Sequence, residues 1–264
     1  MVNVRALVLT GFGINCDAET EMALNRANAA AERVHLSDII ARPGLLETYH
    51  ILALPGGFSF GDDVASGRIL ANRLRYRLGG PMKQFINEGK LVIGICNGFQ
   101  VMVKMGVLPM FNGELVQEVT LTHNNSGRFE NRWVHLRTDA ATRCVWLNGI
   151  ERLELPIRHG EGKFMAKDPG VLARLRDNGQ VAVRYVRRDG APARGEFPSN
   201  PNGSSDDIAG ICDPTGRVFG LMPHPEAFVD GTNHPCWPRL DHQGEGAGLQ
   251  VFRNAVAHVK AHVA

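Results

Sequence analysis

Short apolar runs alternate with stretches of helical periodicity along the first half of the chain. The runs expected to form buried strands are 4–9, 34–36, 51–54 and 91–95. The stretches expected to form helices are 18–31, 64–78, 82–87 and 97–105. Because strands that alternate with helices build βαβ units, this pattern predicts an α/β fold with a doubly wound, mostly parallel sheet and right-handed crossovers.

The second half of the chain is richer in strand-like segments. Its strand candidates are 115–119, 133–136, 181–185, 208–212 and 218–221. Asp213-Pro214-Thr215-Gly216 predicts a hairpin turn between the last two. A final helix is expected over 247–262, and the polar stretches 187–207 and 230–246 are expected to be long surface loops. We therefore expect a single domain over residues 1–264, in which β-rich segments are added to the parallel sheet.

Cys96 stands where the apolar run 91–95 gives way to a helix, and glycines flank it at Gly94 and Gly98. Glycines at such a junction let the chain turn sharply, so the thiol projects above the sheet as in a nucleophile elbow. The start of a helix also offers free N–H groups and a partial positive charge, which favour a thiolate. A lone cysteine beside a strand is more often a small buried hydrophobe, but the flanking glycines make Cys96 a candidate nucleophile.

His224 is the candidate base for this thiol. It follows the run 218–221 within Pro223-His224-Pro225-Glu226, where two prolines restrict the backbone around the imidazole. In an extended segment, residues two apart point the same way, so the Glu226 carboxylate can accept from one ring nitrogen while the other faces the thiol. Alone, this tetrapeptide is more often a rigid loop. Beside a cysteine elbow it predicts a triad of Cys96, His224 and Glu226.

A glycine pair, Gly56-Gly57, follows the run 51–54. The C-terminal ends of parallel strands meet at one edge of the sheet, so backbone N–H groups of this pair can point into the cleft above Cys96, as an oxyanion hole requires. No Gly-Lys-Ser/Thr follows, so the segment is not a P-loop. Gly11-Phe12-Gly13 lacks the third glycine of a dinucleotide-binding loop.

Charge and cysteine content narrow the class of protein. A net charge of +2 on 264 residues gives no electrostatic reason to expect nucleic acid or an anionic membrane as a partner. The five cysteines are odd in number and widely spaced, so we expect a reducing, cytoplasmic compartment. The chain begins directly with a strand-like run, and no apolar run reaches the roughly 18 residues of a membrane helix. Neither a signal peptide nor a membrane span is expected.

These motifs resemble those of the class I glutamine amidotransferases, and within that family the glutaminase subunits of phosphoribosylformylglycinamidine synthase. Gly94-Ile-Cys-Asn-Gly-Phe-Gln100 is similar to the family's nucleophile motif, and His224 and Glu226 match its His-x-Glu. The stretches diagnostic for the subgroup are Gly56-Gly-Phe-Ser-Phe-Gly-Asp62, Asn125-Ser-Gly-Arg-Phe-Glu130, His159-Gly-Glu-Gly162 and Asn200-Pro-Asn-Gly-Ser204. They occur in the family's order, whereas residues 228–246 match nothing diagnostic.

The resemblance implies an activity and a set of partners. Cys96 would attack the side-chain amide of glutamine to give a glutamyl thioester and ammonia, with His224 as the proton carrier and Glu226 orienting it. The residues that would bind the oxyanion or the substrate are Gly57, Asn97 and Gln100. The ammonia would pass to a separate synthetase subunit that carries ATP and magnesium, in a complex that also holds a small bridging subunit. No cofactor is expected in this chain.

The remaining chemical signals in the sequence are weaker. Arg128 is a candidate for binding the substrate carboxylate or a neighbouring subunit, against the ordinary alternative of a solvated charge. His159 is a candidate for lining the cleft or contacting a partner, against that of a plain turn. The remaining side chains that can bind metals near one another in sequence are His234, Cys236, Asp241 and His242. Their spacing matches no zinc motif, so no metal site is expected.

Three other functions stay open at this point. A different class I amidotransferase is disfavoured by the motifs at 159–162 and 200–204. A cysteine hydrolase or stress protein with a similar elbow usually carries a histidine directly after the cysteine, where this chain has Asn97. A purely regulatory subunit is disfavoured because the three residues of the expected triad are all present.

Overall fold

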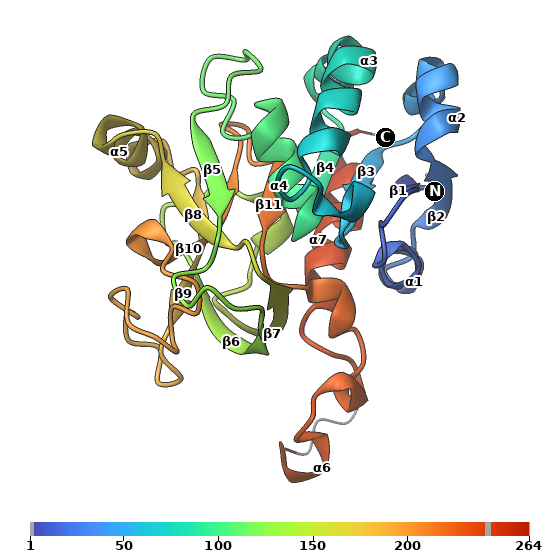
Figure 1. The fold of residues 1–264 in the computed structure, drawn as a ribbon. Coiled ribbons are helices and arrows are strands. Elements are labelled where there is room, and N and C mark those ends of the chain that lie inside the picture. The colour runs from blue at the N-terminus through green and yellow to red at the C-terminus, as the bar shows by residue number, and fades with distance from the viewer. Residues whose placement is uncertain (1–2, 241–243, 264) are drawn as a thin grey trace.

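The centre of the fold is a nine-stranded sheet (Figure 1), in a computed structural model that describes residues 3–240 and 244–263. From one edge to the other, its strands are β2 (Ala30–His35), β1 (Arg5–Thr10), β3 (Ile51–Leu54), β4 (Leu91–Ile95), β11 (Val218–Leu221), β10 (Ile208–Cys212), β9 (Val181–Val186), β6 (Glu130–Thr138) and β7 (Arg152–His159). A separate two-stranded sheet pairs β5 (Val119–Thr122) with β8 (Lys163–Ala166).

The first five strands of this order, β2 to β11, run parallel to one another. The strands β3, β4 and β11 are buried along their whole length, as their apolar sequences predict. This half of the sheet confirms the predicted doubly wound arrangement. The other strands, β10, β9, β6 and β7, pair antiparallel and form the expected β-rich addition.

The described helices include two that differ from the prediction. The α-helices are α1 (Asp17–Arg26), α2 (Leu36–Ala41), α3 (Arg68–Asn87), α4 (Asn97–Met105), α5 (Pro169–Asp177), α6 (Trp237–Leu240) and α7 (Leu249–His262). The short 3₁₀ turns are η1 (Pro43–Thr48), η2 (Ser59–Asp62), η3 (Val145–Leu147), η4 (Ser205–Asp207), η5 (Pro225–Ala227) and η6 (Gly231–Asn233). Helix α3 continues through Pro81 instead of forming two helices, and α1 stops at Arg26 because Ala30 already pairs with β1.

The helices cover both faces of the parallel half of the sheet. Helices α3 and α4 pack together on one face, and α1 packs with α7 on the other (Figure 1). No helix in the described ranges is long and apolar enough to span a membrane. In Figure 1 residues 230–240 extend away from this body and carry α6, so this part of the predicted surface loop 230–246 is a projecting loop.

Strand β7 and its neighbours were the main elements that the sequence did not predict. β7, β8 and α5 were not expected at all, and β5 begins at the residue where a strand was expected to end. Within β7, Pro156 interrupts the alternation of apolar and polar residues that marks a half-buried strand. Such a proline is tolerated because β7 is an edge strand.

Replacing Gly98 with alanine should strongly destabilise the fold. A Cβ on Gly98, in the first turn of α4, would collide with the carbonyl oxygen of Leu54 at the end of β3. Since this obstacle is backbone, we expect Gly98→Ala to lower the free energy of unfolding by at least about 3 kcal/mol in urea titrations.

Gly79→Ala is the matched control, because Gly79 is also a buried helical glycine. A Cβ there would meet the side chain of Leu115 at 3.6 Å, an ordinary contact. The control should be neutral or stabilising by up to about 1 kcal/mol. Equal losses for both variants would show that the approach of α4 to β3 is not the tight contact described.

Candidate active site

Cys96 occupies a strained turn between β4 and α4. Its backbone has φ 51° and ψ −105°, a conformation that L-residues adopt only when the surrounding structure holds them there. Its N–H donates to the carbonyl of Leu221 at 2.8 Å, which ties the turn to β11. A Cβ on Gly94 would collide with Met102, and one on Gly98 would collide with Leu54. The two flanking glycines are therefore required by close packing, as the elbow interpretation predicts.

His224 and Glu226 meet directly after β11. Nδ1 of His224 lies 2.6 Å from Oε1 of Glu226, and both side chains are buried. The hydrogen bond assigns the ring proton to Nδ1 and leaves Nε2 as the acceptor. Glu226 reaches the ring from the 3₁₀ turn η5 and not from an extended segment. The two residues are brought together as predicted, but by a different backbone geometry.

Charge around the ring of His224 favours its protonated form. Burial alone would disfavour a charge on the imidazole, but the Glu226 carboxylate and the sulfurs of Cys96 and Cys16 hold the pKa of His224 well above its ordinary value. Nε2 of the ring is buried and has no hydrogen-bond partner among the residues that the structure describes. The arrangement can therefore accept a proton from a thiol and pass it to a molecule in the cleft.

Two backbone N–H groups lie at the same edge of the sheet. Gly57 adopts φ +145° and bridges to Ile14 in the loop after β1, and a Cβ on Gly57 would collide with the backbone of that loop. Asn97 is the first residue of α4, so its N–H has no acceptor within the helix. Both positions suit donors for a negatively charged oxygen beside Cys96.

The side chains of Asn97 and Gln100 are used within the protein. Asn97 accepts from the N–H of Ser59 at 3.2 Å and donates to Asp62 and to Oε1 of Gln100 at 3.1 and 2.9 Å. Gln100 in turn donates to the carbonyl of Glu161 at 2.5 Å. This chain of hydrogen bonds clamps the loop after β3 and the loop after β7 to α4. A direct role for Gln100 in substrate binding stays a prediction.

His159, at the end of β7, is a buried hub and not part of a plain turn. Its Nδ1 lies 3.1 Å from Oδ1 of Asn124, and a Cβ on Gly162 would collide with its ring. Burial, together with the charge of the nearby His224, lowers the pKa of His159 to about 3, so the ring is neutral. Asn202 donates to the carbonyl of Gly162 at 2.8 Å. The N–H of Asn125 donates to the carbonyl of Asn202 at 3.1 Å, so three of the motifs noted in the sequence are joined in space.

Arg128 is the one candidate that stays on the surface. Its side chain is exposed and forms no recorded hydrogen bond or ion pair with any described residue. Its carbonyl accepts from the side chain of Asn124 at 2.9 Å, which places it beside the hub at His159. The position leaves the guanidinium available to a partner or ligand, and its role stays a prediction.

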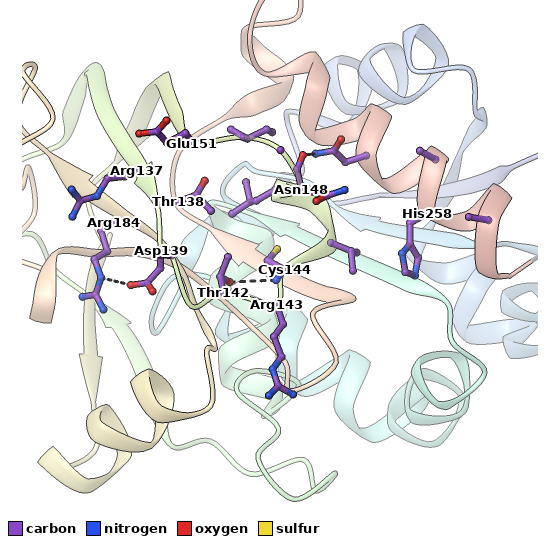
Figure 2. Close-up of a pocket in the computed structure, with 18 of the residues that line it drawn as sticks. Arg137, Thr138, Asp139, Thr142, Arg143, Cys144, Asn148, Glu151, Arg184 and His258 are labelled. Atoms are coloured by element: carbon purple, nitrogen blue, oxygen red, sulfur yellow. Dashed lines mark hydrogen bonds and ion pairs between the residues drawn. The ribbon is translucent and has the colours of Figure 1, made fainter.

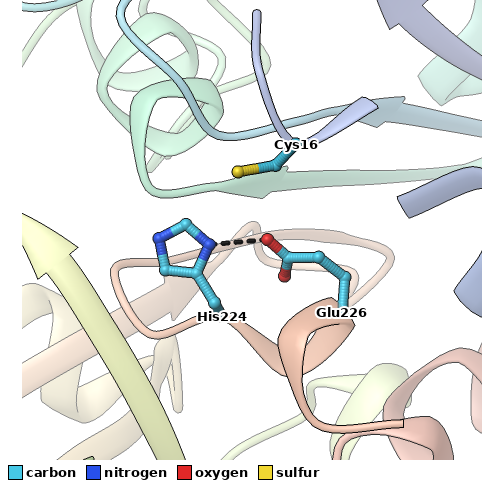
Figure 3. A group of neighbouring side chains, drawn as sticks. All are labelled: Cys16, His224 and Glu226. Atoms are coloured by element: carbon cyan, nitrogen blue, oxygen red, sulfur yellow. Dashed lines mark hydrogen bonds and ion pairs between the residues drawn. The ribbon is translucent and has the colours of Figure 1, made fainter. Parts of the chain in front are cut away.

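Two residues beside Cys96, His224 and Glu226 were missed from the sequence. The sulfur of Cys16 faces the ring of His224 (Figure 3) and lies within 4.8 Å of ligand atoms of His224 and Glu226. Arg158, on β7, was not singled out at all. Its carbonyl lies 3.7 Å from the sulfur of Cys96, and its Nη2 lies 3.5 Å from Nδ1 of His224. Neither proximity has a signal in sequence spacing.

Cys16, His224 and Glu226 are also the one group in the described ranges that could hold a metal ion. Nδ1 of His224 is already bonded to Glu226, and the Arg158 guanidinium 3.5 Å from that nitrogen would repel a cation. Asp241 and His242, considered as ligands from the sequence, lie outside the described residues. The geometry therefore favours proton transfer at this cluster over metal binding.

A large hollow of the described surface lies away from Cys96. It has a volume of about 1190 Å³ and is lined by the segment from Arg137 to Glu151 and by α7 (Figure 2). Because β6 runs opposite to β4, this groove lies at the edge of the sheet opposite Cys96. Arg184, one of its cations, is paired with Asp139 at 2.8 Å. Size alone does not identify the reactive site of this protein.

Comparison with known proteins yields one family. The model of the CobB/CobQ-like glutamine amidotransferase domain matches residues 3–259. The phosphoribosylformylglycinamidine synthase subunit PurQ of Dehalococcoides mccartyi is 47% identical over 97% of this chain and 98% of that protein. The PurQ subunit of Methanococcus maripaludis is 41% identical over 96% of this chain and 97% of that protein.

Solved structures give the same result at the level of the fold. A chain in the structure of PurLQS from Thermotoga maritima superposes with a TM-score of 0.74 at 29% identity, and the match covers 98% of this chain and 100% of that one. A glutamine amidotransferase from Thermotoga maritima superposes with a TM-score of 0.57 at 15% identity, over 98% of each chain. The second likeness concerns the fold alone.

Acid should destabilise the protein through His159. Its pKa is about 3 when folded, whereas the ordinary value is 6.5. Between pH 6.5 and pH 3, the unfolded chain therefore binds a proton at this side chain that the folded protein does not bind. The free energy of unfolding therefore falls as the pH drops from 6.5 toward 3, by about 2 kcal/mol at pH 5. Urea unfolding at a series of pH values measures this slope.

The slope should flatten in His159→Gln, whatever stability that substitution costs at neutral pH. His123→Gln, in the exposed loop after β5, controls for the loss of a histidine and should keep the slope. An unchanged slope in His159→Gln would contradict the buried, neutral state.

Proposed function

Because the chain belongs to the CobB/CobQ-like glutamine amidotransferase domain family, and within it to the family of the phosphoribosylformylglycinamidine synthase subunit PurQ, we propose that Cys96, His224 and Glu226 are its catalytic triad. The chain is the glutaminase subunit of that synthase, an enzyme of purine biosynthesis. The observation that carries the assignment of residues is the strained Cys96 turn tied by one hydrogen bond to β11, the strand that leads into His224 and Glu226.

The reaction follows from the groups at hand. His224 takes the proton of the Cys96 thiol, and the thiolate attacks the side-chain carbonyl carbon of glutamine. The C–N bond then breaks as His224 returns the proton to the leaving ammonia, which leaves a glutamyl thioester on Cys96. Water attacks the thioester, with His224 accepting its proton, and glutamate leaves as the thiol is restored. Glu226 keeps Nε2 of the ring directed at the reacting atoms.

The carbonyl oxygen gains negative charge in both attacks. The backbone N–H groups of Gly57 and Asn97 stabilise this oxyanion, since both belong to rigid turns at the same edge of the sheet. The chain of hydrogen bonds through Asn97 and Gln100 holds these turns in place beside Cys96. Positioning of this kind needs no metal or cofactor in this chain.

The ammonia serves a synthetase partner. One of the matched chains comes from the structure of PurLQS from Thermotoga maritima, and this chain likewise associates with a synthetase subunit. ATP and magnesium belong to that partner, and a small bridging subunit completes the complex. A cytoplasmic location, expected from the cysteine content, is part of this proposal.

Replacing Cys96 with alanine should separate the two half-reactions. In the complex with the synthetase, Cys96→Ala should lose glutamine-dependent synthesis by several orders of magnitude, because the covalent nucleophile is gone. Synthesis from added ammonia should stay near the wild-type rate, because Cys96 takes no part in the ATP-dependent step. The measurement is product formation with glutamine or with ammonium as the nitrogen source.

Cys236→Ser, at an exposed cysteine of the projecting loop, is the matched control and should keep both activities. Equal loss of both activities in Cys96→Ala would rule out separate sites for the two half-reactions.

A glutamine analogue that carries an electrophile should label a single cysteine. At near-stoichiometric amounts we expect modification of Cys96, with protection by excess glutamine, because this thiol directly precedes Asn97, one of the two proposed oxyanion donors. Cys16 is the informative competitor, since its sulfur also faces His224. Peptide mapping by mass spectrometry of wild type, Cys96→Ala and Cys16→Ser identifies the labelled residue. Labelling that survives in Cys96→Ala and disappears in Cys16→Ser would assign the nucleophile to Cys16.

A further inference from the structure

The guanidinium of Arg158 lies against the triad and has no part in the steps above. Its Nη2 is 3.1 Å from Oε2 of Glu19, in the first turn of α1, and 3.5 Å from Nδ1 of His224. Its Nε is buried and has no hydrogen-bond partner in the described part of the chain. A single carboxylate thus anchors this cation, and the nitrogen that it holds, Nη2, is also the one that lies beside the ring of His224.

Folding stability does not account for this placement. The side chains of Arg158 and Glu19 are 35% and 42% exposed, and ion pairs at such exposure stabilise proteins little because water and salt screen them. The backbone of β7 already supports the site, since the carbonyl of Pro156 accepts from the N–H of His224 at 2.9 Å. The charge of Arg158 is the feature that still needs an explanation.

The contact between Arg158 and His224 is electrostatic. The hydrogen on Nδ1 is directed at Glu226, at 2.6 Å, so Nδ1 has no lone pair for Arg158 to donate to. A fixed positive charge makes every nearby deprotonation easier: it favours the Cys96 thiolate and opposes the imidazolium. Glu226 acts on the ring in the opposite sense, because a carboxylate favours the imidazolium. The two charges therefore pull the basicity of His224 in opposite directions.

We propose that Arg158 is a positioning residue of the glutaminase centre, whose charge, anchored by Glu19, offsets that of Glu226 and sets the pH range in which Cys96 and His224 exchange a proton. The inference rests on the proposed glutaminase function and deepens it. A base transfers protons best when its pKa lies near the working pH. Glu226 and the sulfurs of Cys96 and Cys16 hold the pKa of His224 well above its ordinary value even beside Arg158, so losing the charge of Arg158 would make the ring hold its proton more tightly still.

Other groups around Arg158 do not supply the same charge. The titratable side chains near it are Cys16 and Glu19 at the start of α1, Cys96 after β4, His159 on β7, and His224 and Glu226 after β11. His159 is neutral because burial, with the charge of His224, lowers its pKa to about 3. Apart from His224 itself, the remaining groups are carboxylates and thiols, which carry negative charge when ionised. Arg158 is therefore the fixed cation of this cluster within the described residues.

The test compares Arg158→Met, which keeps much of the shape, with Arg158→Lys, which keeps the charge. Arg26→Met is the matched control: Arg26 also forms a half-exposed ion pair from α1, with Asp230 at 3.4 Å, but has no recorded contact with the triad. Two quantities are followed against pH in the complex with the synthetase. One is kcat/KM for glutamine, and the other is the rate of alkylation of Cys96 by iodoacetamide, resolved by peptide mass.

We expect both limbs of the kcat/KM profile and the midpoint of Cys96 alkylation to move up by about half to one pH unit in Arg158→Met. At neutral pH, kcat should fall about tenfold with KM changed less. Arg158→Lys should shift less than half as far, and Arg26→Met should not shift. Added salt should reduce the difference between wild type and Arg158→Met.

Two results would overturn the inference. Profiles of Arg158→Met that overlay those of wild type would show that the charge is not felt at the triad. Equal shifts in the Met and Lys variants would show that shape, and not charge, matters. Either result leaves the glutaminase function intact if wild type releases glutamate. Absence of glutamate release by wild type in the complex would instead reject the function itself, while the alkylation profiles would still report on Arg158.

Discussion

The close approach of α4 to the parallel strands is the constraint on which the site depends. Gly94 and Gly98 let the helix start against β3 and β4, with no room for a side chain at either position. This approach forces Cys96 into its strained turn, and the buried centre of the sheet holds it there. Because β11 lies beside β4 and accepts from the N–H of Cys96, the same contact also sets where His224 emerges.

The parallel and antiparallel halves of the sheet contribute differently to the site. The parallel half presents the proposed reacting groups at the ends of its strands. The antiparallel half supplies their support: β7 holds the backbone of His224 through Pro156 and lies against the thiol of Cys96 through Arg158. After β7, hydrogen bonds join His159 to the loop that precedes β6, and Gly162 to the loop that precedes β10. Loss of this support would leave the triad present but poorly held.

Local signals in the sequence identified the elements that carry the proposed triad. The run 91–95 and the helix 97–105 appear in the structure with the predicted bounds, because an apolar run, a glycine turn and a glycine stop are all local features. Local signals did not predict β7, because Pro156 interrupts the sequence pattern of this edge strand. The helix at the N-terminus was predicted too long because pairing with β1 overrides the helical propensity of residues 30–31.

The sequence by itself determined the nucleophile turn, the histidine and carboxylate that follow β11, and the doubly wound sheet that brings them to one edge. Each of these depends on residues close together in the chain, and the spacing of such residues reflects the local backbone conformation. Only the tertiary structure decided that Cys16 faces His224, that Arg158 lies beside the triad, and that His159 is a buried neutral hub. These side chains come from strands and loops far apart in sequence. Their proximity depends on strand order and on burial, and no local pattern of residues encodes either.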